Sequence, residues 1–325
     1  MATFKLTPDT GQVSGTNTDM PLVVIPSELE IGALTTAEAE SIRFYSDASL
    51  STELPREVVS ADEIHVKVSS VSSSTEIWAD YDGVRADYAV TATYGRNAVW
   101  SDYRAVWHLG NTTDSTGNGF TLTESGSVSV GAEKIGNGYD LPGGSSDWLV
   151  IPDGTFNSPS EYTYTIWYKP DVLSGIETAL ITWQNDYNIQ LFHRGDSSRL
   201  EHSTYDGSTE VSVNSGAISI GTWVKATAAL NSGTMYTYTD GALSNSASSN
   251  NPSTISAGSR IGSHRTGFGN EINGKVDECR LTNNYLGLSW ETTEHANQND
   301  NAAFWVATEV ETVTASPIAH ILQMI

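Results

Sequence analysis

The sequence predicts an all-β protein that folds into two β-sandwich domains. Short segments of alternating or continuous apolar residues recur from the first residues onward, and clusters of Ser, Thr, Gly, Pro and Asp separate them. Short strands with turn residues at regular spacing are typical of β-sandwiches. Helical patterns occur only in short segments, so we expect the helices to decorate the sandwiches and not to define them.

The first domain is expected to span residues 1–103. Its expected strands are the apolar or alternating runs at 4–7, 21–25, 41–45, 64–71 and 76–81. The segment 35–40 suffices for one helical turn only. Residues 98–104 then lead into the next unit without a Pro or a Gly/Ser-rich spacer, so we expect the two domains to pack closely.

The second domain is expected to span residues 104–300. Its segment 162–168 alternates, which places Tyr162, Tyr164, Ile166 and Tyr168 on one face of a strand and Thr163, Thr165 and Trp167 on the other. Aromatic bulk on both faces indicates a central strand. The run 235–239 followed by Asp240 and Gly241 predicts a hairpin, and the Ser/Asn-rich run 244–253 predicts a polar edge or loop.

One short helix is expected late in the chain, with Ser289 as its N-cap and 290–297 as its body. Residues 301–325 would form a separate terminal segment. Within it, 302–313 returns to a strand pattern. The apolar residues after Pro317 are expected to dock on the fold itself or on a neighbouring molecule.

The composition limits the classes of function. Acidic residues outnumber basic ones 39 to 16, which gives a formal net charge of −23, so we expect no nucleic-acid binding. Cys279 is the only cysteine, so disulfides do not hold the fold together. No apolar run is long enough for a membrane helix and no secretory signal is visible. We therefore expect a soluble chain without membrane insertion, exported, if at all, by a non-classical route.

The order of several segments carries a family resemblance. WHL, DSTGN, GYDLPGGSSDWLVIP, IWYKP, TWVK, YTDG and GKVDECRL follow one another from residue 107 to about 298. This region resembles the laminin-G-like, concanavalin A-like jelly-roll family. The preceding IRFYSD, LPREV, TEIWADYDG and YGRNAVWSDY resemble the uncharacterised β domain that commonly precedes such jelly rolls in bacterial and phage surface proteins. The resemblance implies a double-sheet jelly roll that recognises carbohydrate or protein, often with a structural calcium ion.

Glycoside hydrolysis, the enzymatic alternative for this fold, needs two carboxylates on one face of a sheet. Asp277 and Glu278 are adjacent, so regular strand alternation would point them to opposite faces. Asp277 would then point inward with Cys279, while Glu278 and Arg280 would form a solvated charge pair. The chain contains no Glu-x-Asp-x-x-Glu pattern, and we expect no catalytic residues.

Calcium would need several oxygen ligands that converge from loops. The candidate ligands are Asp114, Asn118, Asp147, Asp153 and Asp277. The loop residues among them also have a turn-forming explanation, and Asp277 could instead accept hydrogen bonds from loop amides. The seven histidines form no metal-like spacing along the chain.

Sugar recognition usually combines an aromatic ring with amide or carboxylate groups. Three segments offer that combination. The candidate ligand-binding residues in them are Trp183, Asn185, Asp186, Tyr187, His202, Tyr205, His264 and Phe268. Each aromatic residue also has a packing explanation.

Three functions remain open from the sequence. The first is a non-enzymatic structural or adhesion protein on the surface of a bacteriophage virion, as a decoration, fibre or tail component. It would bind a surface glycan or protein through its jelly-roll loops and assemble with copies of itself or with other virion proteins. The second is a carbohydrate-binding module of a bacterial surface or secreted protein, and the third is a glycoside hydrolase with carboxylates from distant loops.

Overall fold

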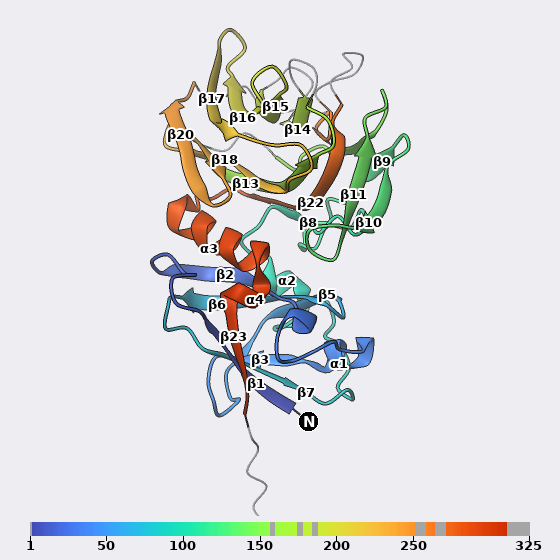
Figure 1. The fold of residues 1–325 in the computed structure, drawn as a ribbon, viewed down its shortest axis with the longest axis vertical. Helices are drawn as coiled ribbons and strands as arrows, with labels where there is room; N and C mark the ends of the chain where they lie inside the picture. The colour runs from blue at the N-terminus through green and yellow to red at the C-terminus, as the bar shows by residue number, and fades with distance from the viewer. Residues whose placement is uncertain are drawn as a thin grey trace, which may run out of the picture.

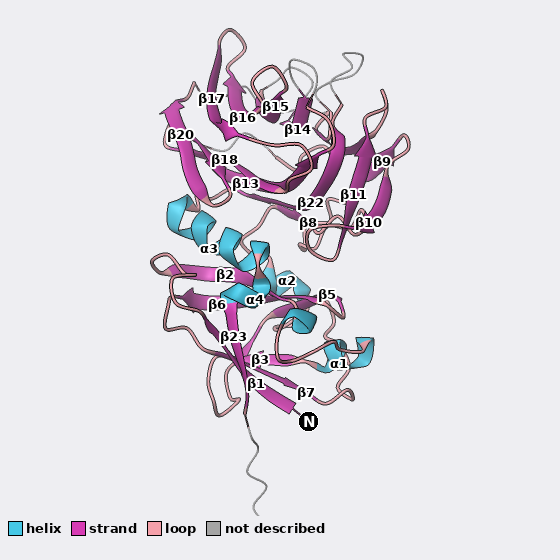
Figure 2. Ribbon diagram, in the orientation of Figure 1, coloured by secondary structure: helices cyan, strands magenta, loops and turns pink. Residues whose placement is uncertain are grey.

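The computed structural model describes residues 2–156, 160–173, 178–183, 188–250, 252, 258–263 and 271–310. Two β-rich domains lie end to end, and the helix α3 (Gly287–Asn299) runs between them (Figure 1). Strands dominate both domains, and the helices gather in the first domain and at the junction (Figure 2). The prediction of two β-sandwich domains is confirmed.

The first domain consists of two sheets around its own core. Its strands are β1 (Ala2–Pro8), β2 (Asn17–Val24), β3 (Arg43–Tyr45), β4 (Glu53–Leu54), β5 (Arg56–Ser60), β6 (Glu63–Val71), β7 (Ile77–Tyr81) and β23 (Trp305–Glu309). One sheet has the order β23-β1-β7-β3-β4 and the other β2-β6-β5. The alternating residues that predicted these strands, such as Leu6, Leu22 and Val66, are fully buried between the sheets.

The end of the described chain returns to the first domain. Strand β23 pairs antiparallel with β1, and the core of this domain includes Phe304 and Trp305. Residues 301–310 therefore complete the first sandwich, which corrects the expected separate terminal segment. The apolar residues after Pro317 lie outside the described residues. The start of β1 and the end of β23 lie at the pole opposite the second domain (Figure 1).

The second domain is a sandwich of an eight-stranded and a seven-stranded sheet. Its strands are β8 (Ala105–Trp107), β9 (Thr123–Ser125), β10 (Ser129–Ala132), β11 (Asn137–Pro142), β12 (Trp148–Val150), β13 (Glu161–Pro170), β14 (Thr178–Trp183), β15 (Ile189–Arg194), β16 (Arg199–Tyr205), β17 (Glu210–Ala217), β18 (Val224–Asn231), β19 (Thr234–Thr239), β20 (Ala242–Ser248), β21 (Arg260–Ile261) and β22 (Asn273–Thr282). One sheet has the order β10-β11-β22-β13-β18-β19-β20, with β8 paired to β22. The other has the order β17-β16-β15-β14-β21-β12-β9.

Strand β13 lies at the centre of the eight-stranded sheet, between β22 and β18, as its two aromatic faces predict. The face with Tyr162 and Tyr164 packs in the jelly-roll core. The opposite face points towards α3, where Trp167 Nε1 donates a hydrogen bond to Gln298 Oε1 at 2.7 Å. The seven-stranded sheet lies on the far side of the sandwich from the first domain (Figure 1).

The helices are α1 (Thr36–Ser41), α2 (Arg96–Val99), α3 and α4 (Asn301–Phe304), together with a 3-10 turn at Pro26–Glu28. Helix α3 is longer than expected and begins before Ser289, whose hydroxyl donates to the Ser14 carbonyl instead of capping the helix. Asn297 accepts a hydrogen bond from Val23 N at 2.7 Å and donates one to Val23 O at 2.9 Å. Helix α3 is covered by one domain on each side, so its polar residues form hydrogen bonds with both domains.

No helix in the described part of the chain combines the length and the apolar run that a bilayer crossing would require.

The hairpin between β19 and β20 turns at Asp240 and Gly241, both with positive φ (51° and 73°), as predicted. A Cβ added to Gly241 would lie 2.7 Å from His295 Cβ and 2.8 Å from Glu291 O, so the turn packs directly against α3. Gly233, in the preceding hairpin turn, also has a positive φ (81°) but no atom within 4 Å of an added Cβ.

We expect Gly241→Ala to lower the free energy of unfolding by more than about 2 kcal/mol, because backbone strain and a steric clash add together. The matched control Gly233→Ala carries only the strain and should cost about 1 kcal/mol. Urea denaturation of both variants measures the difference. Equal losses would mean that the hairpin does not approach α3 this closely.

Candidate functional site

Two of the predicted ligand-binding residues lie inside the jelly roll. Trp183 is fully buried in the core. His202 is also fully buried; its Nε2 lies 3.0 Å from Tyr162 Oη and its Nδ1 lies 3.2 Å from Tyr236 O. The expectation of an exposed platform is therefore wrong for Trp183 and His202. Tyr205 is half-buried at the end of β16.

The remaining predicted ligand-binding residues lie outside the described residues. They are Asn185, Asp186, Tyr187, His264 and Phe268.

The seven-stranded sheet has a polar face that points away from the core, which we call the outer face. Ile181 and Leu191 are cross-strand partners in the core, so the next residues along β14 and β15 point the other way. Thr182 pairs with Gln190, and Gln190 pairs with Ser203 on β16. Cross-strand partners share a face, so these three polar side chains form one row across three strands.

The three side chains are buried, but polar atoms in them lack hydrogen-bond partners. Thr182, Gln190 and Ser203 are each at most 1% exposed. Thr182 Oγ1, Gln190 Nε2 and Ser203 Oγ have no hydrogen-bond partner among the atoms that the structure describes. A buried polar atom without a partner costs about 1–3 kcal/mol, so a water molecule or a ligand that supplied the missing partners would stabilise this row.

Apolar and charged groups lie beside this row. Phe192 and Glu201 are cross-strand partners on the outer face. At the β12 end of the sheet, the Arg260 guanidinium lies 4.6 Å from the centre of the Trp148 ring. The outer face therefore combines aromatic rings with hydroxyl, amide and carboxylate groups, the combination that sugar recognition uses.

The predicted calcium ligands do not converge. Asp114 accepts hydrogen bonds from Val106 N, Thr116 N and Phe120 N at 2.9–3.1 Å, and so holds its own loop. Asp147 accepts from Ser127 N and Gly144 N, both at 2.7 Å.

The other predicted loop ligands also have local partners. Asp153 accepts a 3.4 Å bond from Gly258 N, and Asn118 donates to the Arg104 carbonyl at 3.0 Å. Within the described ranges, none of the predicted aspartates belongs to a group of three or more metal-binding side chains. These residues therefore do not fit a calcium site at one point, and calcium binding stays a prediction.

A β-bulge on β22 gives the side chains at 277–280 other orientations than regular strand alternation predicts. Trp167 pairs with Asp277 and Thr165 with Arg280, so two steps on β13 face three steps on β22. Glu278 occupies the bulge with a φ of 48°. The extra residue shifts the alternation, so that Asp277, Glu278 and Arg280 all point towards the first domain while Cys279 packs in the jelly-roll core.

Three expectations are corrected by this bulge. Asp277 does not point into the jelly-roll core; its carboxylate accepts from Ile135 N at 2.7 Å and from Glu278 N at 2.8 Å. Glu278 and Arg280 are not a solvated pair, because each is only 1% exposed. Asp277 and Glu278 are also not separated onto opposite faces, since regular alternation does not hold across a bulge.

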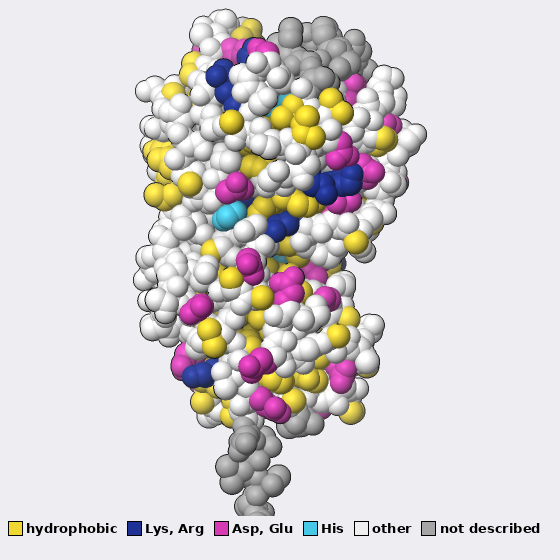
Figure 3. All heavy atoms as spheres, viewed as in Figure 1, with side chains coloured by type: hydrophobic (Ala, Val, Ile, Leu, Met, Phe, Trp, Pro, Cys, Tyr) yellow, Lys and Arg dark blue, Asp and Glu magenta, His cyan; other side chains and the backbone are white. Residues whose placement is uncertain are grey.

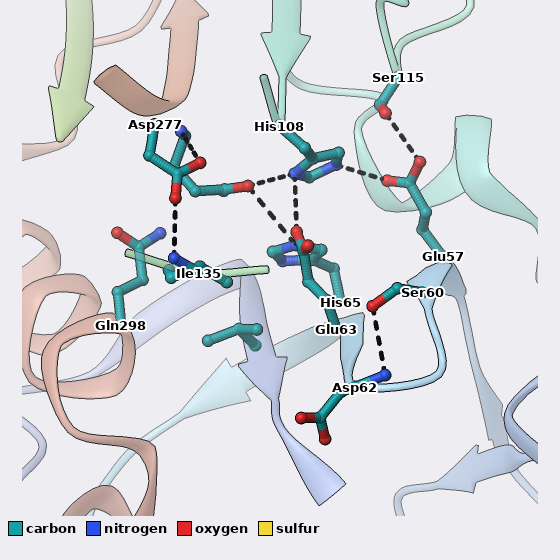
Figure 4. Close-up of polar contacts among 12 residues, drawn as sticks. Glu57, Ser60, Asp62, Glu63, His65, His108, Ser115, Ile135, Asp277 and Gln298 are labelled. Carbon is teal, nitrogen blue, oxygen red and sulfur yellow. Dashed lines mark hydrogen bonds and ion pairs between the residues drawn. The ribbon is translucent and has the colours of Figure 1, made fainter. Parts of the chain in front are cut away.

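A group of ionisable side chains lies buried where the two domains meet, and we call it the junction cluster (Figure 4). Its members are Glu57, Glu63, His65, His108, Glu278 and Arg280. The first three come from β5 and β6 of the first domain, and the last three from the loop after β8 and from β22 of the second.

His108 connects acids of both domains. Its Nδ1 contacts Glu278 Oε1 and lies 3.4 Å from Glu63 Oε1, while its Nε2 lies 3.0 Å from Glu57 Oε2. The ring stacks on His65 with 4.5 Å between centroids. His65 Nε2 in turn lies 3.1 Å from Glu63 Oε1. Figure 4 shows these side chains pointing towards one another from the two domains.

The surroundings of the two imidazoles in the junction cluster shift their pKa values in opposite directions. Burial alone would lower the pKa of His108, but the negative charges of Glu278 and Glu57 outweigh burial and raise its pKa well above the usual value. Burial, assisted by the nearby His108, lowers the pKa of His65 well below the usual value.

The pKa values of two of the three glutamates in the junction cluster, Glu63 and Glu278, are shifted in opposite directions. Burial, with Glu278 nearby, raises the pKa of Glu63. Burial would also raise the pKa of Glu278, but the positive charges of His108 and Arg280 hold it well below the usual value. Without a metal ion the cluster is thus a proton-sharing network with one imidazolium, and its two imidazoles and two carboxylates are also a donor set for a divalent metal.

Helix α3 adds a second set of buried charges. Arg280 donates to Glu278 and, at 2.8 Å, to Glu294 Oε1. Lys225 Nζ lies 2.7 Å from both Glu291 Oε2 and Glu294 Oε2. All of these side chains are at most 2% exposed.

A surface cavity of about 210 Å³ reaches the junction cluster from solvent. Glu57, His108 and Ser115 are among the residues that line it. Ser115 Oγ donates to Glu57 Oε1 at 2.7 Å, which holds the carboxylate in the wall of this cavity.

Spacing along the chain gives little sign of this cluster. Glu63 and His65 are two residues apart on a predicted strand, so a shared face could be inferred. Nothing in the sequence links them to His108 or to Glu278, because strand pairing and a bulge bring these residues together.

We expect Lys225→Met to lower the free energy of unfolding by about 3–5 kcal/mol, because buried Glu291 loses its counter-charge and Glu294 is left with Arg280 alone. Lys5→Met is the control, since Lys5 pairs with Glu76 at 3.2 Å on the surface and its loss should cost under about 1 kcal/mol. Chemical denaturation compares the two variants. A loss for Lys225→Met as small as that of the control would contradict the buried pairing.

Burial lowers the pKa of His202 from 6.5 to about 4. The unfolded chain therefore takes up a proton between these pH values while the folded chain does not, so stability is complete above pH 6.5 and falls as the pH drops towards 4. We expect His202→Gln to reduce this fall by about 1.4 kcal/mol per pH unit. Urea denaturation between these pH values measures both slopes, and identical slopes would show that His202 does not titrate this way.

Comparison with known proteins agrees with the fold. Residues 142–289 match the family model of the concanavalin A-like lectin/glucanases superfamily. No curated protein sequence matches the chain.

Solved structures with a similar fold include two toxin domains. The binding domain of paraclostridial mosquitocidal protein 1 has a TM-score of 0.52 at 14% identity, over 60% of this chain and 52% of that chain. The ligand-binding domain of botulinum neurotoxin serotype D, solved with N-acetylneuraminic acid, has a TM-score of 0.50 at 15% identity, over 61% and 51%. This chain therefore spans about half the length of these toxin domains.

A third similar structure is domain 4 of an extracellular arabinanase from Geobacillus stearothermophilus, solved with arabinotriose. Its TM-score is 0.49 at 21% identity, over 60% of this chain and 98% of that chain. With the family match and the two-sheet architecture, the second domain of this chain is a laminin-G-like, concanavalin A-like jelly roll.

Proposed function

We propose that this chain is a non-enzymatic adhesion protein that binds a surface glycan through the outer face of its seven-stranded sheet. The observation that carries the proposal is the buried row of Thr182, Gln190 and Ser203, whose polar atoms lack partners in the described structure. The row is at most 1% exposed, so a glycan would reach it only after the groups that cover the outer face move aside. Sugar hydroxyl groups both donate and accept hydrogen bonds, so they would then satisfy this row.

The chemistry around the row supports a neutral glycan. Trp148, which is partly exposed, offers apolar surface for the C–H face of a sugar ring. Acidic side chains are scattered over both domains (Figure 3), and the formal net charge is −23. Such a surface repels polyanions at long range, so an uncharged polysaccharide is the better partner.

Binding without cleavage is supported by where the carboxylates lie. Asp277 and Glu278 share a face, but they are buried at the domain junction and their oxygens already accept hydrogen bonds. On β16 and β17 the outer face carries Glu201 and Glu210, whose register places them four residues apart. That is about 13 Å along the strands, beyond the roughly 5–10 Å that a pair of hydrolytic carboxylates spans.

The arrangement of the domains supports display on a particle, such as a bacteriophage virion. The outer face lies at the pole opposite β1 and β23 (Figure 1). The buried contacts of His108 with Glu57 and Glu63 join the jelly roll to the first domain. A particle that held the first domain, through further copies or other virion proteins, would present the jelly roll outward to a bacterial surface glycan.

We expect the purified chain to bind neutral bacterial polysaccharides on a glycan array and to release no reducing ends. Gln190→Ala should weaken binding about tenfold, because a hydrogen bond to the ligand is worth about 1.4 kcal/mol. Asn245→Ala, on the exposed edge strand β20, is the matched control and should bind like the unchanged chain.

Two results would refute the proposal. One is a folded chain that binds no glycan on the array. The other is steady release of reducing ends that stops when a single carboxylate is neutralised, which would establish a hydrolase instead.

A further inference from the structure

We propose that the junction cluster is a zinc site that locks the two domains together. Glu63 and His65 of the first domain would supply two ligands, and His108 and Glu278 of the second would supply the other two. In the described part of the chain this is the one group of three or more His, Cys, Asp or Glu side chains whose ligand atoms gather closely; all four atoms lie within 4.8 Å of one another.

The distances fit a tetrahedral ion. Zinc bonds of about 2.0–2.1 Å to nitrogen and oxygen place neighbouring ligand atoms about 3.3 Å apart. His65 Nε2 lies 3.1 Å from Glu63 Oε1 and 3.9 Å from Glu278 Oε1. His108 Nδ1 lies 3.4 Å from Glu63 Oε1 and closer to Glu278 Oε1. The two imidazole rings are stacked with 21° between their planes, so they must also rotate before both nitrogens point at one ion.

Glu57 provides the outer support that metal-bound histidines usually have. A histidine ligand commonly donates its other ring N–H to a carboxylate, which fixes its orientation. His108 Nε2 lies 3.0 Å from Glu57 Oε2, and the same carboxylate accepts from Ser115 Oγ at 2.7 Å and from Trp100 Nε1.

The charges around the cluster favour a cation. Glu57, Glu63 and Glu278 are buried within it, and Asp277 adjoins Glu278. Arg280 is the group among them whose positive charge is permanent, and it is shared with Glu294 of α3. Buried carboxylates in this excess must take up protons or bind a metal ion, because unpaired buried charge is costly. A divalent ion would satisfy two carboxylates and leave both imidazoles neutral.

The ligand set points to a structural and not a catalytic ion. Four protein ligands would close the coordination shell, whereas a catalytic zinc keeps one position open for water or substrate. The four ligand residues are at most 6% exposed, and the cavity at His108 gives an ion a route from solvent. One contact would be lost on zinc binding, namely that of Arg280 with His65 Nδ1 at 3.5 Å, since this nitrogen would then carry the proton.

The first experiment uses the full chain, freed of metal with a chelator and dialysed. Titration with zinc should show one ion per chain with a dissociation constant below about 1 µM, and a higher melting temperature. Cobalt(II) in place of zinc should give the visible absorption of tetrahedral coordination, which reports the geometry without any substitution. A folded chain that binds neither ion stoichiometrically would overturn the proposal and leave the cluster as a proton-sharing network.

Substitutions then test the ligand assignment. His65→Gln should weaken zinc binding more than about 100-fold, and Glu57→Gln, behind His108, about 10- to 100-fold. His295→Gln is the matched control; His295 is a partly exposed histidine of α3 outside the cluster, and its substitution should leave affinity unchanged. Unchanged affinity in folded His65→Gln would exclude this site. If that variant does not fold, the cobalt spectrum of the unchanged chain decides.

Discussion

The arrangement of this protein depends on charges buried between its two domains, above all on Arg280. Its guanidinium donates to Glu278 on the same strand and to Glu294 on α3, and it lies 4.9 Å from the centre of the Trp100 ring of the preceding domain. Removing one partner of such a buried ion pair strongly destabilises the fold, because the remaining charge stays desolvated and unpaired. The jelly roll, α3 and the first domain are therefore coupled through one side chain.

A single extra residue in β22 makes this coupling possible. The bulge at Glu278 turns Asp277, Glu278 and Arg280 to the same side, where a regular strand would have sent one of them into the jelly-roll core. Cys279 takes the core position instead. The local irregularity thus brings acids from β22 to the histidines of β6 and of the loop after β8. It also moves these acids out of reach of any large substrate, so their burial, and not the pleat of the strand, argues against hydrolysis.

The two faces of the seven-stranded sheet differ: one packs in the core, and the other is the face proposed to bind a glycan. One face buries Trp183 and His202 against the opposite sheet, where His202 contacts Tyr162 Oη. The other face carries hydroxyl and amide groups without partners. Alternation along each strand produces this division, since neighbouring residues must point to opposite sides. The proposed binding surface and the core therefore come from the same strands.

The sequence by itself determined the all-β class, most strand positions, the central place of β13 and the hairpin at Asp240 and Gly241, because short-range alternation and turn preferences decide these features. Only the tertiary structure decided that β23 returns to the first domain, that α3 is buried on two sides, and that Glu63, His65, His108 and Glu278 meet. These outcomes depend on pairing between distant segments and on a one-residue bulge. Neither leaves a periodic signal, because a bulge changes the register of a strand without changing its composition.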